Sequence, residues 1–113
     1  MLKKENRLRK TKEIEGVFKE GRSFYDQFFT LKTKKNNTEL NRLCVVISAK
    51  VSKKSVDRNK LKRRVRAIFY SKKNELKNGF DFLIIAKKDT NNQEFKIIKE
   101  SINDLFGRAK VIK

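Results

Sequence analysis

The chain has 113 residues, with 31 Lys and Arg against 13 Asp and Glu, which gives a formal net charge of +18. This length predicts one domain with a single hydrophobic core, and 37% hydrophobic residues with nine Phe favour a folded chain over a disordered basic tail. The charge predicts a polyanionic partner, with nucleic acid as the first candidate, while one Cys and no His exclude Cys-His and Ser-His catalytic pairs and the familiar zinc sites.

The first ten residues form a predicted basic arm. They have little apolar content, so we expect an extended segment whose only evident contact is with phosphate. The basic residues of this arm are Lys3, Lys4, Arg7, Arg9 and Lys10. A short amphipathic helix is predicted next, over residues 12–20, because Ile14, Val17 and Phe18 are spaced as i, i+3 and i+4. Gly21 suits the end of that helix.

Two strands and a long helix follow. Aromatic and β-branched residues predict a strand over residues 24–33, and the polar segment 34–41 returns the chain into a second strand over residues 42–48. We expect these two strands to pair as an antiparallel hairpin. From about residue 55 to residue 77 the apolar residues recur at helical spacing, which predicts a long helix with one apolar side.

The last third of the chain predicts one more strand and one more helix. Residues 80–87 (FDFLIIAK) are apolar on both faces beyond Asp81, which is typical of a strand in the middle of a sheet. Residues 95–106 return to helical spacing until Gly107. The order of these elements predicts an α+β fold in one domain spanning residues 1–113, with helices packed on a small sheet.

The densest basic segment spans residues 50–66, where nine basic residues stand against one acidic residue, Asp57. On a helix, Arg58, Lys62 and Arg66 recur at i, i+4 and i+8 along one side, while the apolar residues face the core. Like charges at this spacing destabilise an isolated helix by roughly 0.2–0.5 kcal/mol per pair, so the pattern favours an anionic partner against it. A solvated basic face is the alternative interpretation.

Within that segment, RNKLKRRVR (residues 58–66) resembles the Arg-Asn-x-x-Lys-Arg-x-x-Arg signature of the bacterial ribonuclease P protein family. Four further blocks resemble the same family in the same order: KKENRLRKTKEIEGVFKEGRSF, VVISAK, FDFLIIAK and SINDLF. The likeness covers essentially the whole chain. It implies a two-layer α+β sandwich related to a ribosomal-protein domain, with a left-handed β-α-β crossover through the signature helix, although right-handed crossovers are the general rule.

The resemblance also implies a function. It describes a protein subunit that assists a catalytic RNA, ribonuclease P RNA, in removing the 5′ leader of precursor tRNA by phosphodiester hydrolysis. The protein then has no catalytic residue of its own and binds both that RNA and precursor tRNA. Mg²⁺ is implied for the complex and is held mainly by the RNA. The lack of His and of clustered carboxylates agrees with a protein that is not itself the catalyst. We assign no metal ligands to the protein and expect no obligate protein partner.

Two sets of binding residues follow from the resemblance. The set facing the catalytic RNA is Lys50, Lys53, Lys54, Arg58, Asn59, Lys62, Arg63 and Arg66; Arg suits this task because its planar group grips phosphate and stacks on bases. A cleft between the first helix and the sheet is implied for the single-stranded leader, at Ile14, Phe18, Phe28, Thr30 and Lys32. The family often has an aromatic residue where Ile14 stands, and Phe18 and Phe28 fit a hydrophobic core equally well.

Two other functions stay open on the sequence alone. A ribosomal or rRNA-assembly protein has the same small, basic character. A stand-alone metal-dependent nuclease needs converging carboxylates, whereas the aspartates are scattered along the chain: Asp26, Asp57, Asp81, Asp89 and Asp104. No apolar run approaches the roughly 18 residues of a membrane span, and the lone Cys44 forms no internal disulfide, so we expect a cytoplasmic protein.

Overall fold

The computed structural model describes residues 3–113, and the first two residues of the predicted arm lie outside the described residues. A four-stranded mixed sheet in the order β1-β2-β4-β3 forms its centre. The strands are β1 (Arg22–Tyr25), β2 (Phe29–Lys35), β3 (Arg42–Val46) and β4 (Phe80–Ala86). The pairs β1–β2 and β2–β4 are antiparallel, whereas β3 and β4 are parallel.

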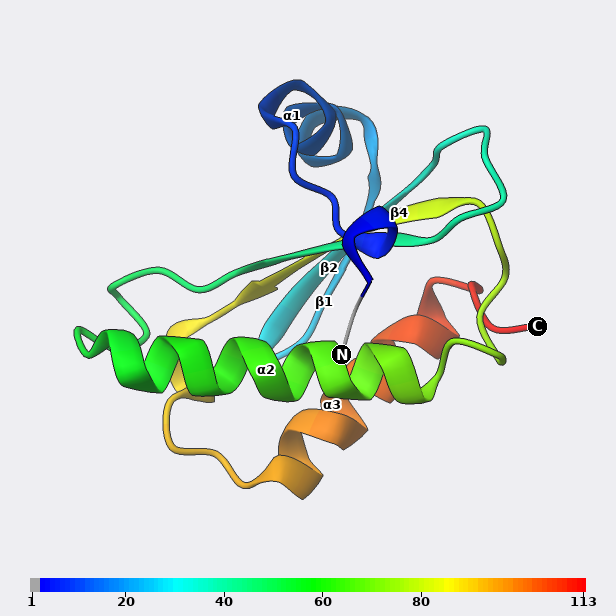
Figure 1. The fold of residues 1–113 in the computed structure, drawn as a ribbon. Helices are drawn as coiled ribbons and strands as arrows, with labels where there is room; N and C mark the ends of the chain where they lie inside the picture. The colour runs from blue at the N-terminus through cyan, green and yellow to red at the C-terminus, as the bar shows by residue number, and fades with distance from the viewer. Residues whose placement is uncertain (1–2) are drawn as a thin grey trace.

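Helices cover both faces of this sheet (Figure 1). On one face lies α1 (Thr11–Glu20), and on the other lie α2 (Ser55–Ser71) and α3 (Phe95–Arg108). Two short 3-10 helices, η1 (Lys4–Asn6) and η2 (Lys88–Thr90), precede α1 and follow β4. We call the two sides of the sheet the α1 face and the α2 face. The predicted α+β fold is confirmed.

The main core lies between the α2 face and its two helices. Phe69 of α2, Phe82 of β4 and Phe106 of α3 pack edge to face, with ring centroids 5.1–6.3 Å apart, an arrangement that aromatic rings prefer. Leu61 and Val65 of α2 are buried on the side that the helical spacing predicts. β4 lies between β2 and β3, which confirms its predicted place in the middle of the sheet.

The N-terminal arm packs on the protein, and the prediction that only phosphate contacts it is wrong. Leu8 is buried with Val17 and Leu83 on the α1 face. The Leu8 amide donates to the carbonyl oxygen of Leu43 at 2.9 Å, and Arg7 forms a parallel bridge with the same residue. One apolar side chain and two β-type contacts therefore hold the arm along β3. Only part of the arm is extended, since residues Lys4–Asn6 form the 3-10 helix η1.

The predicted hairpin between the second and third strands is also wrong, because β4 lies between β2 and β3. The loop after β2 is held by the turn that precedes β4. The Asn36 amide donates to the Gly79 carbonyl at 2.9 Å, and the Asn41 side chain bonds Lys77 and Phe80 at 2.8 and 3.0 Å. β3, α2 and β4 form a parallel β-α-β unit, for which the left hand stays a prediction.

Two element boundaries also differ from their predictions. Residues 24–33 form two strands because the Asp26 carboxylate accepts bonds from the amides of Phe28 and Phe29, both at 2.8 Å, and closes a turn. The helix predicted to reach residue 77 ends at Ser71. Leu76, which extends the helical spacing in the sequence, is buried instead through a bridge with Ile112 near the C-terminus.

Candidate nucleic-acid interface

The α1 face carries one uncovered row of side chains. In the register of the sheet, neighbouring strands pair Tyr25 with Thr30, Thr30 with Ile85, and Ile85 with Val46. These four residues therefore line up across all four strands, and we call them the open row. Tyr25 is 65% exposed and Val46 is 38% exposed. A largely apolar row with exposed ends on so basic a protein is a candidate contact for nucleic-acid bases.

The open row is exposed at its two ends because α1 and the arm pack mainly on the neighbouring row, while Thr30 and Ile85 in its middle are half-buried and Ile85 also touches the small core. There Val17 and Leu8 are buried against Leu83. Phe18 projects from α1 with 55% of its surface exposed. The Lys32 ammonium lies 4.8 Å from the centre of that ring and donates to the Phe18 carbonyl oxygen at 3.2 Å. An exposed ring and a cation therefore stand together beside the row.

Four of the five residues predicted for the leader lie on the α1 face. Thr30 and Lys32 come from β2, and Ile14 and Phe18 come from α1. Ile14 is half-buried against the small core of this face. Phe28 does not join them, because its turn directs it against the main core on the α2 face. The structure therefore supports the other interpretation of Phe28, as a residue that packs on the core.

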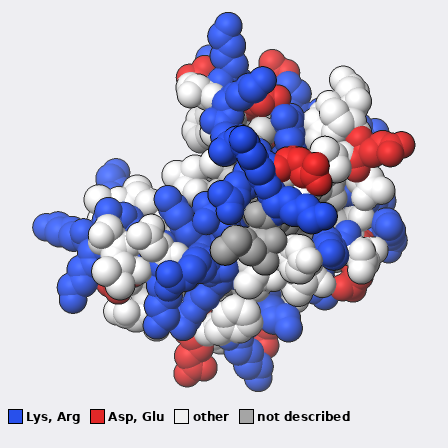
Figure 2. Space-filling view, in the orientation of Figure 1, with Lys and Arg blue, Asp and Glu red and all other residues white. Residues whose placement is uncertain are grey.

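The basic residues of the signature helix border the α1 face at β3. Burial raises the pKa of the Cys44 thiol on β3, and the nearby charges of Lys62 and Arg66 oppose that rise. Arg58 turns back along the chain, where its guanidinium donates to the Ser52 carbonyl oxygen at 2.7 Å. The remaining predicted residues are all exposed: Lys50, Lys53, Lys54, Asn59 and Arg63. Figure 2 shows Lys and Arg atoms running from α2 toward the N-terminal segment.

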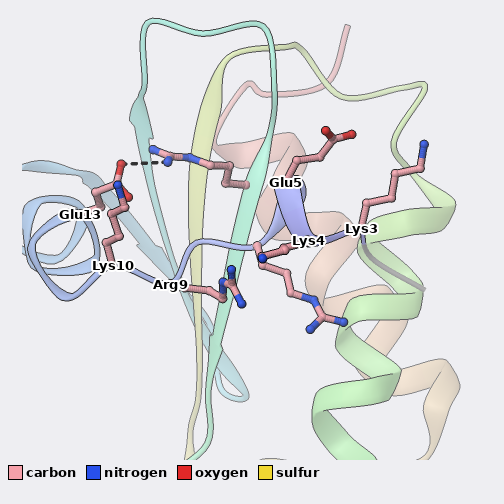
Figure 3. Close-up of a pocket in the computed structure, with 8 residues that line it drawn as sticks. Lys3, Lys4, Glu5, Arg9, Lys10 and Glu13 are labelled. Atoms are coloured by element: carbon pink, nitrogen blue, oxygen red, sulfur yellow. Dashed lines mark ion pairs between the residues drawn. The ribbon is translucent and has the colours of Figure 1, made fainter.

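The arm and α1 also line a basic hollow of about 680 Å³ (Figure 3). Its walls are Lys3, Lys4, Glu5, Arg7, Arg9, Lys10, Glu13 and Arg42. All five basic residues predicted for the arm therefore gather at one place. Figure 3 shows the ion pair between Glu13 and Arg42, and the Nε atom of Arg7 is buried with no hydrogen-bond partner among residues 3–113. The surplus of positive charge suits a phosphate group.

Arg42 joins α1 to the sheet. Its Nε and Nη2 atoms donate to the two carboxylate oxygens of Asp81, both at 2.8 Å, and its Nη1 atom lies 2.8 Å from Oε2 of Glu13. The hydrogen bond to Asp81 is the main cause of a raised pKa of Arg42. Because Asp81 belongs to β4 and Glu13 to α1, this network fixes α1 over the sheet and so places Phe18 beside the open row.

Among residues 3–113, no three Asp, Glu, Cys or His side chains lie together where they could bind an ion. In the part of the chain that the structure describes, each helix is too short or too polar to cross a bilayer.

Sequence reasoning missed three residues of this surface: Tyr25, Ile85 and Val46. Alternation along each strand does indicate which residues share a face. The row itself depends on the strand order, in which β4 enters between β2 and β3. The periodicity within each segment does not give that order, and the hairpin prediction pointed to a different one.

A mixed sheet with an open apolar row, bordered by a basic helix and a basic arm, defines a small nucleic-acid-binding protein. The family model described as ribonuclease P matches residues 2–110. The ribonuclease P protein component of Clostridium botulinum (strain 657 / Type Ba4) is 35% identical over 109 residues, which cover 96% of this chain and 97% of that relative. The chain belongs to the bacterial ribonuclease P protein family.

Solved structures agree with this assignment. The RNase P protein from Thermotoga maritima matches with a TM-score of 0.81 at 34% identity, covering 90% of this chain and 96% of that one. The RNase P protein of Staphylococcus aureus matches with a TM-score of 0.88 at 27% identity, covering 96% and 98%. The chain is thus a protein subunit of ribonuclease P, the endoribonuclease that processes the 5′ leader of precursor tRNA, and RNase P RNA is its partner. The function that the signature implies is confirmed, and the ribosomal and nuclease alternatives are set aside.

Proposed function

We propose that this chain binds RNase P RNA along the basic side of α2 and binds the single-stranded leader of precursor tRNA on the α1 face. The position of Cys44 carries the proposal. This residue lies on β3 against the small core of the α1 face, and α2 packs on the same strand, with Lys62 and Arg66 near the Cys44 thiol. The two surfaces are therefore neighbours, and an RNA bound to α2 lies close to a substrate strand on the sheet.

The α1 face suits single-stranded RNA of varied sequence. Phe18 offers an exposed ring, and stacking a base on such a ring contributes about 1–3 kcal/mol whatever the base. Lys32 lies beside the ring and supplies a positive charge for the adjoining phosphate. Thr30, Ile85 and Val46 extend the contact along the open row. Ile14 is half-buried, so we assign it to the support of this surface.

The basic side of α2 suits a folded RNA. Asn59 and Arg63 are exposed on consecutive turns of the helix, and Lys50, Lys53 and Lys54 precede it. A guanidinium bonds phosphate through two parallel N–H groups, and an amide bonds a base edge or the backbone. The basic hollow of the arm adds a further phosphate contact. In this proposal the positive charges of these residues bind RNA phosphates. This explains the basic side of α2 better than the alternative of a basic face in contact with solvent alone.

In this proposal the protein binds and orients RNA, and the Mg²⁺ on which hydrolysis depends is held mainly by the RNA. The described residues hold no cluster of carboxylates for the metal, so the chain itself contributes contacts with substrate and with RNase P RNA. Precursor tRNA is the second partner. We expect no obligate protein partner, and we expect the complex to work in the cytoplasm.

Two single substitutions test the separation of the surfaces. Arg63→Ala removes an exposed cation of α2, and we expect weaker binding of RNase P RNA with unchanged binding of a single-stranded leader oligonucleotide. Phe18→Ala removes the exposed ring, and we expect the leader oligonucleotide to lose about 1–3 kcal/mol of affinity while RNase P RNA is retained. Filter binding at one fixed salt concentration measures both affinities.

Lys99→Ala is the matched control, because this exposed lysine lies on α3, away from the α1 face. It removes one positive charge, as Arg63→Ala does. We expect it to lower either affinity only by the small amount that loss of one distant positive charge causes. If Arg63→Ala and Phe18→Ala each weaken the affinity for RNase P RNA and the affinity for the leader oligonucleotide equally, the two surfaces are not separate. Cleavage of precursor tRNA by RNase P RNA at low Mg²⁺, with and without each variant, then relates binding to activity.

A further inference from the structure

We infer that RNase P RNA also binds a basic belt, which runs from the arm past the end of β2 to the C-terminal end of α3. The inference rests on the proposed binding of this RNA to α2 and the arm. Two further hollows, of about 330 and 490 Å³, follow the basic hollow of the arm. Neighbouring hollows share walls: Glu13 and Arg42 line the first two, and Lys34 and Lys35 line the last two. We call the three hollows together the basic belt, because one RNA backbone can follow them without a break.

The belt has more positive charge than its own acidic residues neutralise. The two further hollows add six basic residues to those of the arm: Lys12, Arg22, Lys34, Lys35, Lys77 and Lys110. Their two added acidic residues are already engaged, since Glu20 pairs with Lys34 at 3.0 Å and Asp81 pairs with Arg42 at 2.8 Å. Among residues 3–113, no ion pair engages the other five cations, and all five are exposed. Their mutual repulsion destabilises the free protein, and a polyanion along the belt relieves it.

The hollow at the far end of the belt, which we call the distal hollow, is built from distant segments of the chain. The Lys77 amide donates to the Val111 carbonyl oxygen at 2.7 Å, and the Asn41 side chain donates to the Lys77 carbonyl oxygen at 2.8 Å. The C-terminal segment therefore lies beside the turn that leads into β4 (Figure 1). The Arg22 guanidinium lies 5.2 Å from the centre of the Phe24 ring, which supports it. The walls of the distal hollow are thus in place before RNA binds, and little ordering is left for binding to accomplish.

Lys110 has a backbone conformation that suits glycine better than lysine. It follows α3 with φ 57°, in the left-handed region where Gly is the usual residue at a helix end. Its amide donates to the Gly107 carbonyl oxygen at 3.1 Å, a bond that needs no side chain. A lysine at this position therefore adds a positive charge to the distal hollow at a cost in backbone strain.

The belt lies on the opposite side of α1 from the exposed ring of the α1 face. Lys12, Gly16 and Glu20 recur at i, i+4 and i+8 and line the belt. At 100° per residue, Phe18 is turned about 200° from Gly16. The nearest atom to a Cβ added at Gly16 is the Lys34 ammonium nitrogen, at 3.5 Å, which is an ordinary contact distance. A larger side chain at residue 16 therefore fits the fold and enters the belt without reaching the leader contact.

Binding of RNase P RNA to the full chain over a range of salt concentrations tests the inference. Lys35→Gln and Lys110→Gly each remove one cation of the belt. For each we expect the slope of log affinity against log salt to fall by about 0.7–0.9, and the affinity at about 0.1 M salt to fall about 5- to 8-fold. Gly16→Glu keeps every basic residue and adds a carboxylate to the belt, so it should weaken the same affinity. All three variants should bind a single-stranded leader oligonucleotide as the unchanged protein does.

Two matched controls accompany these variants. Lys99→Ala removes an exposed lysine of α3 that lies nine residues before the helix ends at Arg108, outside the belt. Gly16→Ala adds a side chain at the same position as Gly16→Glu, but without charge. We expect both controls to retain the affinity and the salt dependence of the unchanged protein. Urea unfolding verifies that every variant is folded.

The inference is overturned if the belt variants lower the affinity for RNase P RNA no more than the controls do. It is also overturned if they weaken the binding of mature tRNA alone, because the belt would then belong to the substrate. If Arg63→Ala likewise leaves the affinity for RNase P RNA unchanged, the proposed function fails as well. If Arg63→Ala weakens that affinity as expected, only the belt is refuted.

Discussion

Replacing Asp81 by Asn measures how much the Arg42 network contributes to the fold. Asp81 is only 4% exposed, and its carboxylate accepts two bonds from Arg42 at 2.8 Å and one from Asn36 at 2.9 Å. Asparagine keeps the shape but has one acceptor oxygen and no charge. The Arg42 guanidinium then loses its main partner and faces an added N–H donor.

The size of the effect follows from these contacts. Removing one partner of a buried ion pair costs about 3–5 kcal/mol. Arg42 keeps Glu13 at 2.8 Å, and about a fifth of its side chain is in contact with water, so we expect a loss at or just below the lower limit of this range, about 2–3 kcal/mol. For a domain of this size that loss lowers the melting temperature by about 10 °C. The total free energy of unfolding of such domains is only about 5–15 kcal/mol.

Urea unfolding of both proteins measures the difference at unchanged m value. Asp104→Asn is the matched control, because it makes the same chemical change at an exposed position of α3. It raises the net charge of the protein equally, and we expect it to stay within about 0.5 kcal/mol of the unchanged protein. If Asp81→Asn costs no more than Asp104→Asn, the network does not hold α1 to the sheet in the way that its geometry indicates.

Two further predictions concern the α1 face. Leu8→Ala should destabilise the fold by about 2–5 kcal/mol in urea unfolding, because this buried side chain packs the arm onto the sheet; a loss near zero would mean that the arm is not docked. Burial raises the pKa of the Cys44 thiol above its ordinary 9.0, and only the thiolate reacts. Alkylation by iodoacetamide should therefore be slower than for a free cysteine near neutral pH and should accelerate only at more alkaline pH, whereas equal rates with a free cysteine would contradict the burial.

Periodicity predicted the parts of the fold that depend on a single segment. Leu61 and Val65 face the core because an amphipathic helix must bury its apolar side, and β4 lies in mid-sheet because both of its faces are apolar. The pairing of strands depends on distant segments. The alternation in β2 and β3 fits either a hairpin or a sheet in which a third strand separates them, and only the latter is formed.

The same distinction applies to the binding surface. The signature indicated the basic residues of α2 directly, since they are contiguous in sequence and lie on one helix. Tyr25, Ile85 and Val46 come from three strands, and they form a row only in the observed register. Phe28 shows the opposite case: its aromatic character matched a leader contact, while the Asp26 turn placed it against the main core.

The strand order affects how this chain folds as it is synthesised. β2 and β3 are complete by residue 46, yet the strand that lies between them ends at residue 86. At about 5–20 residues per second, the ribosome needs about 2–8 s to add those 40 residues. During that time both strands have unpaired edges, and the local hairpin that the sequence favours competes with the native order. Completion of β4 is therefore the step at which the sheet, and with it the face that binds the leader, can first form.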